Sequence, residues 1–264
     1  MKLWFLASLF PILLAQTPAP LSLSVGLPDS QVYPQYWNHA GKLEGYLPAL
    51  LRRFAAEAGI VLDLRFYPVR RYVSEFKEER LDFITPSNPL WSENSSKFKV
   101  QYSISFMQSR AGFIGLTSQL HPAHIKDVTT LAGYTVSFLS DKSTGFKDVK
   151  LNYVNSIDSA MMILIARRTD LVYLHFDAVQ EWLRKQQRVK EPVHFHEKYS
   201  ELWDYHLATI KHPGIIADFN RWLQKKPNAV DEAKALVKTL EAPIYPSTSP
   251  GHQTHAPERS PRDP

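Results

Sequence analysis

The chain has 264 residues, of which 44% are hydrophobic and 22% are charged, so it can build one large core or two smaller ones and is not a disordered protein. Lysine and arginine outnumber aspartate and glutamate by 31 to 26 without forming a basic run, which gives no indication of nucleic-acid binding. The sequence contains no cysteine, which excludes disulfides, thiolate-bound metals, cysteine nucleophiles and a lipidated cysteine.

Both ends of the chain differ in composition from the rest. Residues 1–15 begin with Lys2, continue as an apolar run and end at Ala15, which is the pattern of a cleaved secretory signal peptide. A membrane anchor is the alternative, but the run is shorter than the about 20 residues that span a bilayer. Residues 242–264 are rich in Pro, Ser and Thr and predict a disordered tail. Without a lipidation site, we expect a periplasmic protein.

The first half of the remaining chain alternates strand and helix patterns. Strands are predicted at 21–27, 61–68 and 81–85, the first two from alternating apolar and polar side chains. Helices are predicted at 43–59, where apolar residues recur at helical spacing up to a terminal glycine, and at 70–79. This order of elements indicates a parallel sheet with crossover helices.

The pattern recurs in the second half. The predicted elements are a strand at 134–139, a helix beginning at 143–146, a strand at 151–154, a helix at 157–168 and a strand at 169–176. Asp82 and Asp170 each stand between a charged helix end and an apolar strand. The sequence therefore predicts two α/β lobes with a ligand site between them, and two final helices, 213–224 and 229–240, that pack on the first lobe.

The order of these segments resembles a known family. Residues 41–66 (GKLEGYLPALLRRFAAEAGIVLDLRF), Asp82, residues 100–106 (VQYSISF) and the stretch from LAGYTVSF to Trp182 are similar to the family 3 solute-binding proteins, the extracytoplasmic receptors of polar amino acid ABC importers. The resemblance covers about 220 residues, which is nearly all of the chain between the predicted signal peptide and the tail. It implies a two-lobed, periplasmic-binding-protein-like (type II) α/β fold with a ligand cleft between hinge-connected lobes.

The resemblance also implies boundaries and a function. Lobe 1 is expected at 20–112 and 203–241 and lobe 2 at 113–202, with crossing strands near Phe113–Leu116 and Tyr199–Trp203. We expect a monomer without cofactor that captures a small polar, amino acid-like solute by lobe closure and delivers it to an ABC permease. A ligand sensor without transport is the alternative.

The sequence departs from the family at its ligand-binding positions. The arginine that clamps a ligand carboxylate is replaced by Ser96, and His175 stands where an aspartate would bind the ligand ammonium group, with Asp177 two residues further on. Glu79 and Arg167 replace the glycines that end the second helix of each lobe. These changes weaken the prediction that the ligand is an ordinary α-amino acid.

Several other residues are candidates for the cleft. Aromatic side chains suit cyclic, cationic or apolar ligand groups, and arginines or hydroxyls at the start of a helix suit anions. Each also has a structural alternative: the aromatics can cover the core, the arginines can form surface ion pairs and the hydroxyls can be helix N-caps. With the two residues above, the predicted ligand-binding set is Tyr33, Tyr36, Trp37, Arg71, Asn88, Trp91, Arg110, Ser140, Thr144, His175 and Asp177.

Catalytic and metal motifs are weak. His194-x-His196 and His121-x-x-His124 lack a carboxylate at a ligand spacing, so no metal site is predicted. Periplasmic cyclohexadienyl dehydratases resemble these binding proteins, and His175 or Asp177 is then the candidate general acid. Nothing in the sequence favours that enzyme over binding, and we predict a binding protein.

Overall fold

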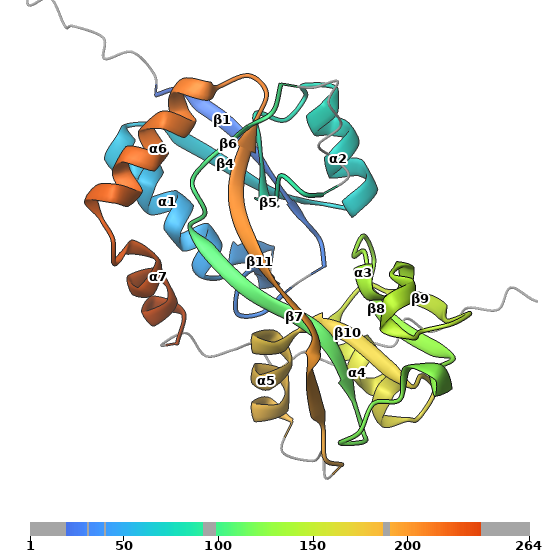
Figure 1. Cartoon of the computed structure of the whole chain (residues 1–264). Coiled ribbons are helices and arrows are strands. Elements are labelled where there is room, and N and C mark those ends of the chain that lie inside the picture. The colour runs from blue at the N-terminus through green and yellow to red at the C-terminus, as the bar shows by residue number, and fades with distance from the viewer. Residues whose placement is uncertain (1–19, 31, 40, 92–98, 187–190, 239–264) are drawn as a thin grey trace, which may run out of the picture.

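The structure is a computed structural model that describes residues 20–30, 32–39, 41–91, 99–186 and 191–238. The predicted signal peptide and tail, and Ser96, lie outside these residues. The described chain forms two α/β lobes, one above the other in Figure 1, joined by two long strands. The predicted fold class is confirmed.

Lobe 1 contains the strands and helices predicted in the first half. Strand β1 (Ser22–Pro28) pairs in parallel with β4 (Val61–Tyr67) and β5 (Phe83–Ser87), and the crossover helices are α1 (Tyr46–Ala58) and α2 (Val69–Lys77). Strands β2 (Trp37–His39) and β3 (Lys42–Glu44) form a hairpin before α1. Helix α1 ends at Gly59, whose φ of 68° is the left-handed conformation that glycine adopts without strain.

Lobe 2 repeats this plan with a second set of parallel strands, which continues the same sheet beyond the crossing strands. Its strands are β8 (Asp127–Leu131), β9 (Lys150–Val154) and β10 (Leu171–His175), and its helices are α4 (Ile157–Ile165) and α5 (Phe176–Lys185). Short elements complete it: η1 (Pro122–His124), α3 (Ser137–Ser140) and η2 (Lys142–Thr144).

The strand predicted at 134–139 and the helix predicted from 143 are wrong. The strand that enters the sheet is the earlier β8, whose β-branched residues at 128–130 are fully buried between β9 and β10. Gly133, at a φ of 88°, then turns the chain out of the sheet, so Tyr134 and Val136 pack without strand pairing and α3 and η2 follow.

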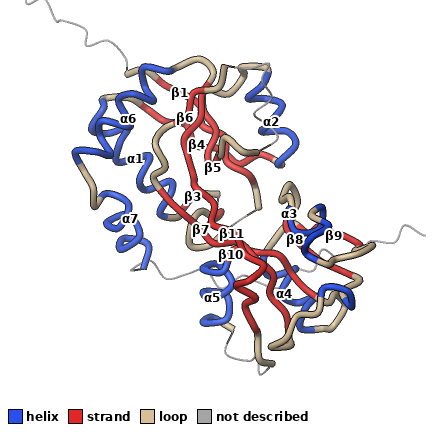
Figure 2. The backbone as a smooth tube through the Cα atoms, viewed as in Figure 1, coloured by secondary structure: helices blue, strands red, loops and turns tan. Residues whose placement is uncertain are grey.

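Two long antiparallel strands connect the lobes. Strand β7 (Met107–Gly115) and strand β11 (His194–Thr209) pair along most of their length and run through both lobes in Figure 2. In lobe 2, β7 pairs with β10, and in lobe 1, β11 pairs with β5 and with β6 (Gln101–Tyr102). The lobe boundaries predicted after residues 112 and 202 fall inside these two strands.

The last two helices lie beside α1 in Figure 1, as predicted. They are α6 (Pro213–Lys225) and α7 (Ala229–Lys238). Phe54 of α1 makes edge-to-face contacts with Phe219 and Trp222 of α6, at ring-centroid distances of 5.0 and 5.7 Å. The chain therefore leaves lobe 1, builds lobe 2 and returns to lobe 1.

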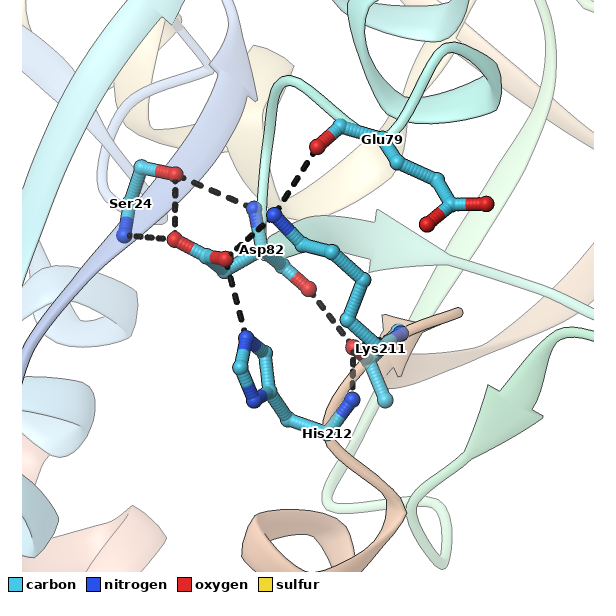
Figure 3. Close-up of polar contacts among 6 residues, drawn as sticks. Ser24, Glu79, Asp82, Lys211 and His212 are labelled. Carbon is cyan, nitrogen blue, oxygen red and sulfur yellow. Dashed lines mark hydrogen bonds and ion pairs between the residues drawn. The ribbon is translucent and has the colours of Figure 1, made fainter.

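Asp82 joins three segments of lobe 1 (Figure 3). Its carboxylate accepts hydrogen bonds from the backbone N–H and the hydroxyl of Ser24, at 2.8 and 2.7 Å. It also contacts Nζ of Lys211 at 2.5 Å and Nε2 of His212 at 2.9 Å. Burial disfavours the ionised carboxylate, but the hydrogen bonds from Lys211, Ser24 and His212 outweigh burial and lower the pKa of Asp82 well below its usual range.

Candidate functional site

Five polar side chains meet where the crossing strands pass between the lobes, and we call them the interlobe cluster: Gln35, Ser109, His175, Asp177 and Tyr205. Gln35 lies in the lobe 1 loop before β2, and Ser109 and Tyr205 lie on the crossing strands β7 and β11. His175 ends β10 and Asp177 opens α5, so both stand at the carboxyl end of a central strand, where open α/β sheets bind ligands.

The cluster is hydrogen-bonded across the two lobes. Nε2 of Gln35 donates to Oγ of Ser109 at 3.1 Å and to Oδ2 of Asp177 at 3.3 Å. Oγ of Ser109 lies 3.1 Å from Oδ1 of Asp177 and 3.0 Å from Nδ1 of His175. The other ring nitrogen of His175 lies 2.8 Å from the hydroxyl of Tyr205. Gln35, Ser109, His175 and Tyr205 are buried, and Asp177 is partly exposed.

The direction of each hydrogen bond follows from the donors available. The Asp177 carboxylate only accepts, so it takes the single hydroxyl hydrogen of Ser109. Nδ1–H of His175 then donates to Oγ of Ser109, and the lone pair on Nε2 accepts from Tyr205. Burial disfavours the imidazolium and lowers the pKa of His175 to about 4, although the charge of Asp177 opposes this shift. His175 is therefore neutral near pH 7.

Tyrosine side chains surround the cluster. The ring of Tyr134 contacts the ring of His175 edge-to-face at 5.3 Å between centroids. Burial, with a further contribution from the charge of Asp177, raises the pKa of Tyr46, Tyr134 and Tyr205 well above the usual range. These phenols therefore stay protonated and can donate hydrogen bonds.

Two further contacts join the lobes near the cluster. Nζ of Lys185, on α5, lies 3.1 Å from the ring centroid of Tyr33, a cation–π contact with the loop of lobe 1. Burial lowers the pKa of Lys185 to about 8, against the opposing charge of Glu181. Gly133, after β8, lies so close to Val69 at the start of α2 that an added Cβ would overlap it.

The predicted aromatic residues of the first loop lie at or beside this region. Tyr36 is buried with its hydroxyl 3.2 Å from Oγ of Ser30, and Trp37 is fully buried against Tyr33 at 4.6 Å between ring centroids. Tyr33, Tyr36 and Trp37 thus belong to the buried core, and Gln35 in the same loop is the residue that contacts Asp177.

Two predicted residues of the loop after β5 support the crossing strand β11. Nδ2 of Asn88 donates to the backbone oxygen of Asp204 at 2.8 Å. The ring of Trp91 packs edge-to-face on Trp203 and Tyr205, at 5.8 and 6.0 Å. Trp91 thus contacts Tyr205 of the interlobe cluster directly, and Asn88 binds the backbone of the residue before Tyr205.

The remaining predicted residues make contacts elsewhere. Arg71 is exposed and pairs with Glu75 on α2 at 3.5 Å, and Nη1 of exposed Arg110 donates to Ser200 at 3.0 Å. The hydroxyl of Ser140 donates to a carbonyl of its own short helix. The hydroxyl of Thr144 likewise contacts the carbonyl oxygens of residues 138 and 141. None of these contacts of Arg71, Arg110, Ser140 and Thr144 reaches the interlobe cluster.

Sequence reasoning did not single out Gln35, Ser109, Tyr134, Tyr205 or Lys185. Gln35 stands between two predicted aromatic contacts, so its place in the loop was a usable signal. Ser109 and Tyr205 face the cluster only because β7 and β11 pair in one register, which the sequence does not reveal.

A cavity lies in lobe 2, at the amino ends of β8 and β10 and thus away from the interlobe cluster. Its volume is about 500 Å³, and His121, His124, Arg167 and Asp170 are among its lining residues. Arg167 pairs with Glu191 at 3.3 Å. Within the described ranges, no group of three or more His, Asp or Glu side chains could hold a metal ion. The same ranges contain no helix of the length and apolarity that a bilayer crossing requires.

Solved structures share this architecture. An ABC uptake transporter substrate-binding protein from Streptococcus pneumoniae with bound histidine is 15% identical, with a TM-score of 0.67 over 81% of this chain and 91% of that one. The arginine-, lysine-, histidine-binding protein ArtJ from Geobacillus stearothermophilus is 16% identical, with a TM-score of 0.67 over 84% and 96% of the two chains.

An arginine transport system periplasmic binding protein from Legionella pneumophila is also 16% identical, with a TM-score of 0.64 over 83% of this chain and 98% of that one. No family model and no curated protein matches the chain. The chain therefore has the two-lobed fold of periplasmic solute-binding proteins, as its sequence resemblance predicted.

Proposed function

We propose that this protein is an exported, periplasmic solute-binding protein that captures a small polar, amino acid-like solute between its lobes. The contact between Gln35 and Asp177 carries the proposal, because it brings polar groups of both lobes together at the carboxyl end of β10. The fold supports it as well, since similar structures were solved with histidine or named for arginine. We propose that the protein acts as a monomer and without a cofactor.

Lobe closure is the proposed mechanism of capture. A ligand that contacts Gln35 from lobe 1 and Asp177 from lobe 2 binds the closed arrangement better than an open one, and it therefore shifts the population toward closure. The strands β7 and β11 are the only described segments that run through both lobes, so the hinge lies in them. The closed form would then present both lobes to a membrane partner.

The order of groups in the cluster argues against a nucleophilic serine triad. In a nucleophilic triad the carboxylate orients the histidine, which in turn takes the proton of the serine. Here Ser109 stands between His175 and Asp177 and gives its proton to the carboxylate. The dehydratase alternative is tested by incubating the bound solute with the protein and analysing it for a product.

The experiment that tests the proposal is a thermal-shift screen of the purified protein against amino acids, organic acids, oligopeptides and prephenate-like compounds. A compound that binds only the folded protein raises the melting temperature by mass action, and small-angle scattering should show compaction with the same compound. The proposal fails if no compound raises the melting temperature.

A pair of variants locates the site. Gln35→Leu removes the amide that reaches Asp177, and we expect it to weaken binding of any solute found in the screen by about tenfold. Gln108→Leu is the matched control, since Gln108 is an exposed amide bound to Asp204. Equal effects of the two variants would place the site elsewhere. Uptake of the labelled solute by cells with and without the protein separates an importer receptor from a sensor.

A further inference from the structure

The orientation of the Gln35 side chain reveals an acceptor without a partner. Nε2 must face Asp177 and Ser109, because the Asp177 carboxylate accepts and cannot donate to Oε1. Oε1 of the same amide is buried and has no hydrogen-bond partner among the described residues, and Gln35 is 0% exposed. A buried acceptor of this kind calls for a donor, because leaving it unpaired costs about 1–3 kcal/mol.

Among the described residues, the Asp177 carboxylate also lacks a complementary partner, which in its case would be a positive charge. Its hydrogen-bond partners, Gln35 and Ser109, are both neutral. Lys185 lies about two helical turns further along α5, and its ammonium group lies on the ring of Tyr33 and contacts Glu181. In the part of the chain that the structure describes, no ion pair joins Asp177 to a cation. A partly buried carboxylate without such a partner favours a cationic ligand.

The surroundings of the carboxylate also suit a cation. The rings of Tyr134 and Tyr205 contact the ring of His175, two residues before Asp177, at 5.3 and 6.0 Å between centroids. Aromatic faces attract ammonium and guanidinium groups, and phenol oxygens accept hydrogen bonds from them. Among the described residues, no lysine or arginine is hydrogen-bonded to the cluster. The two arginines that the sequence suggested, Arg71 and Arg110, are exposed and bind Glu75 and Ser200.

We propose that the solute is a small organic amine or guanidine, and that a carboxylate group on it is not required for binding. Its N–H groups take the place of Nε2 of Gln35 at the Asp177 carboxylate and supply the donor that Oε1 of Gln35 lacks. This inference rests on the proposed function, because it names the class of solute for the same interlobe site.

The test compares amines with carboxylates of the same shape. The purified full chain is titrated calorimetrically with n-butylamine, butylguanidine and phenethylamine, and in parallel with n-butyrate and phenylpropionate. We expect the nitrogen compounds to bind and the carboxylates not to bind. The inference is overturned if the carboxylates bind as well as the amines, or if no amine or guanidine binds.

A charge-neutral variant then locates the cation. Asp177→Asn keeps the shape of the side chain, and we expect it to weaken binding of the best amine at least about tenfold. Asp141→Asn is the matched control, because Asp141 is exposed on lobe 2 and caps η2. Unchanged amine affinity in Asp177→Asn overturns the assignment. If that variant does not fold, the comparison of amines with carboxylates still decides.

The outcomes separate this inference from the proposed function. If amines fail but an amino acid or organic acid raises the melting temperature in the screen, the protein binds a solute of another class and only the inference is wrong. If no compound of any class binds, both are wrong. Binding of amines with loss in Asp177→Asn supports both.

Discussion

Asp82 and Asp170 occupy corresponding places in the two lobes, and each binds the backbone of the first strand of its own lobe. Oδ2 of Asp82 accepts from the backbone N–H of Ser24 on β1, at 2.8 Å. Oδ2 of Asp170 accepts from the backbone N–H groups of Lys126 and Asp127 at the start of β8, at 2.7 and 3.0 Å. The repeated sequence pattern around these aspartates thus corresponds to a repeated contact.

The two aspartates differ in what else they bind, and this difference predicts unequal effects of the same substitution. Asp82 also contacts Lys211 and His212, whereas Asp170 is exposed. We expect Asp82→Asn to lower the free energy of unfolding by about 3 kcal/mol, because the Lys211 ammonium loses its paired charge and His212 loses its carboxylate partner, and Asp170→Asn by about 1 kcal/mol. Urea unfolding at pH 7 measures both. Equal losses would contradict the role given to Lys211 and His212.

Glu79 and Arg167 predict a gain in stability. Both adopt left-handed backbone conformations, with φ of 58° and 54°, that side chains other than glycine adopt at a cost. We expect Glu79→Gly and Arg167→Gly each to raise the free energy of unfolding by about 1 kcal/mol. Lys211 keeps its partner in the first variant, since it donates to the backbone oxygen of Glu79.

Glu78→Gly is the control for this gain. Glu78 precedes Glu79 but has an ordinary φ of −90°, so glycine there relieves no strain, adds its entropic cost and removes the exposed ion pair with Arg80. Thermal unfolding should therefore show Glu78→Gly melting below the parent protein and Glu79→Gly above it. A lower melting temperature for both would show that the left-handed conformation at residue 79 is not strained.

Gly133 predicts an effect on the spacing of the lobes. Gly133→Ala places a methyl group against Val69, which belongs to the other lobe, so we expect the lobes to move apart and the radius of gyration to increase. Gly145→Ala is the matched control: its φ is 84°, close to the 88° of Gly133, and the nearest atom to its Cβ is 3.6 Å away. Small-angle scattering compares them, and equal curves would contradict the interlobe contact.

His175 predicts a pH dependence of stability. Its pKa is about 4 in the folded protein against 6.5 for the free side chain, so between these values the unfolded chain binds a proton that the folded protein does not. Stability is therefore fully present above pH 6.5 and falls by on the order of 3 kcal/mol as the pH decreases to 4. Asp82 does not contribute here, because its lowered pKa affects stability only below the ordinary aspartate pKa of 3.8.

Chemical unfolding at several pH values between those limits measures this dependence. His175→Gln retains a hydrogen-bonding group but does not titrate, so its stability should change less with pH than that of the parent protein. His121→Gln, at an exposed position of lobe 2, should keep the full dependence. A dependence that survives in His175→Gln would assign it to another group.

The sequence alone predicted the two-lobed fold, most of the strands and helices, and the place of His175 and Asp177 at the end of β10. Those features depend on local periodicity and on the order of segments, which neighbouring residues determine. The strand expected at 134–139 was wrong because strand pairing, and not local periodicity, decides which segment enters the sheet. Its apolar alternation suits a strand, but the buried β-branched residues at 128–130 pair with β9 and β10 instead.

Only the tertiary structure decided which side chains form the interlobe cluster. Gln35 and Asp177 are 142 positions apart, and Ser109 and Tyr205 meet His175 only through the register of β7 with β11. The tertiary structure also decided the partners of Arg71 and Arg110. Their guanidinium groups suit anion binding, but in the fold they bind Glu75 and Ser200. Long-range pairing sets these contacts, and a single sequence carries no local signal of it.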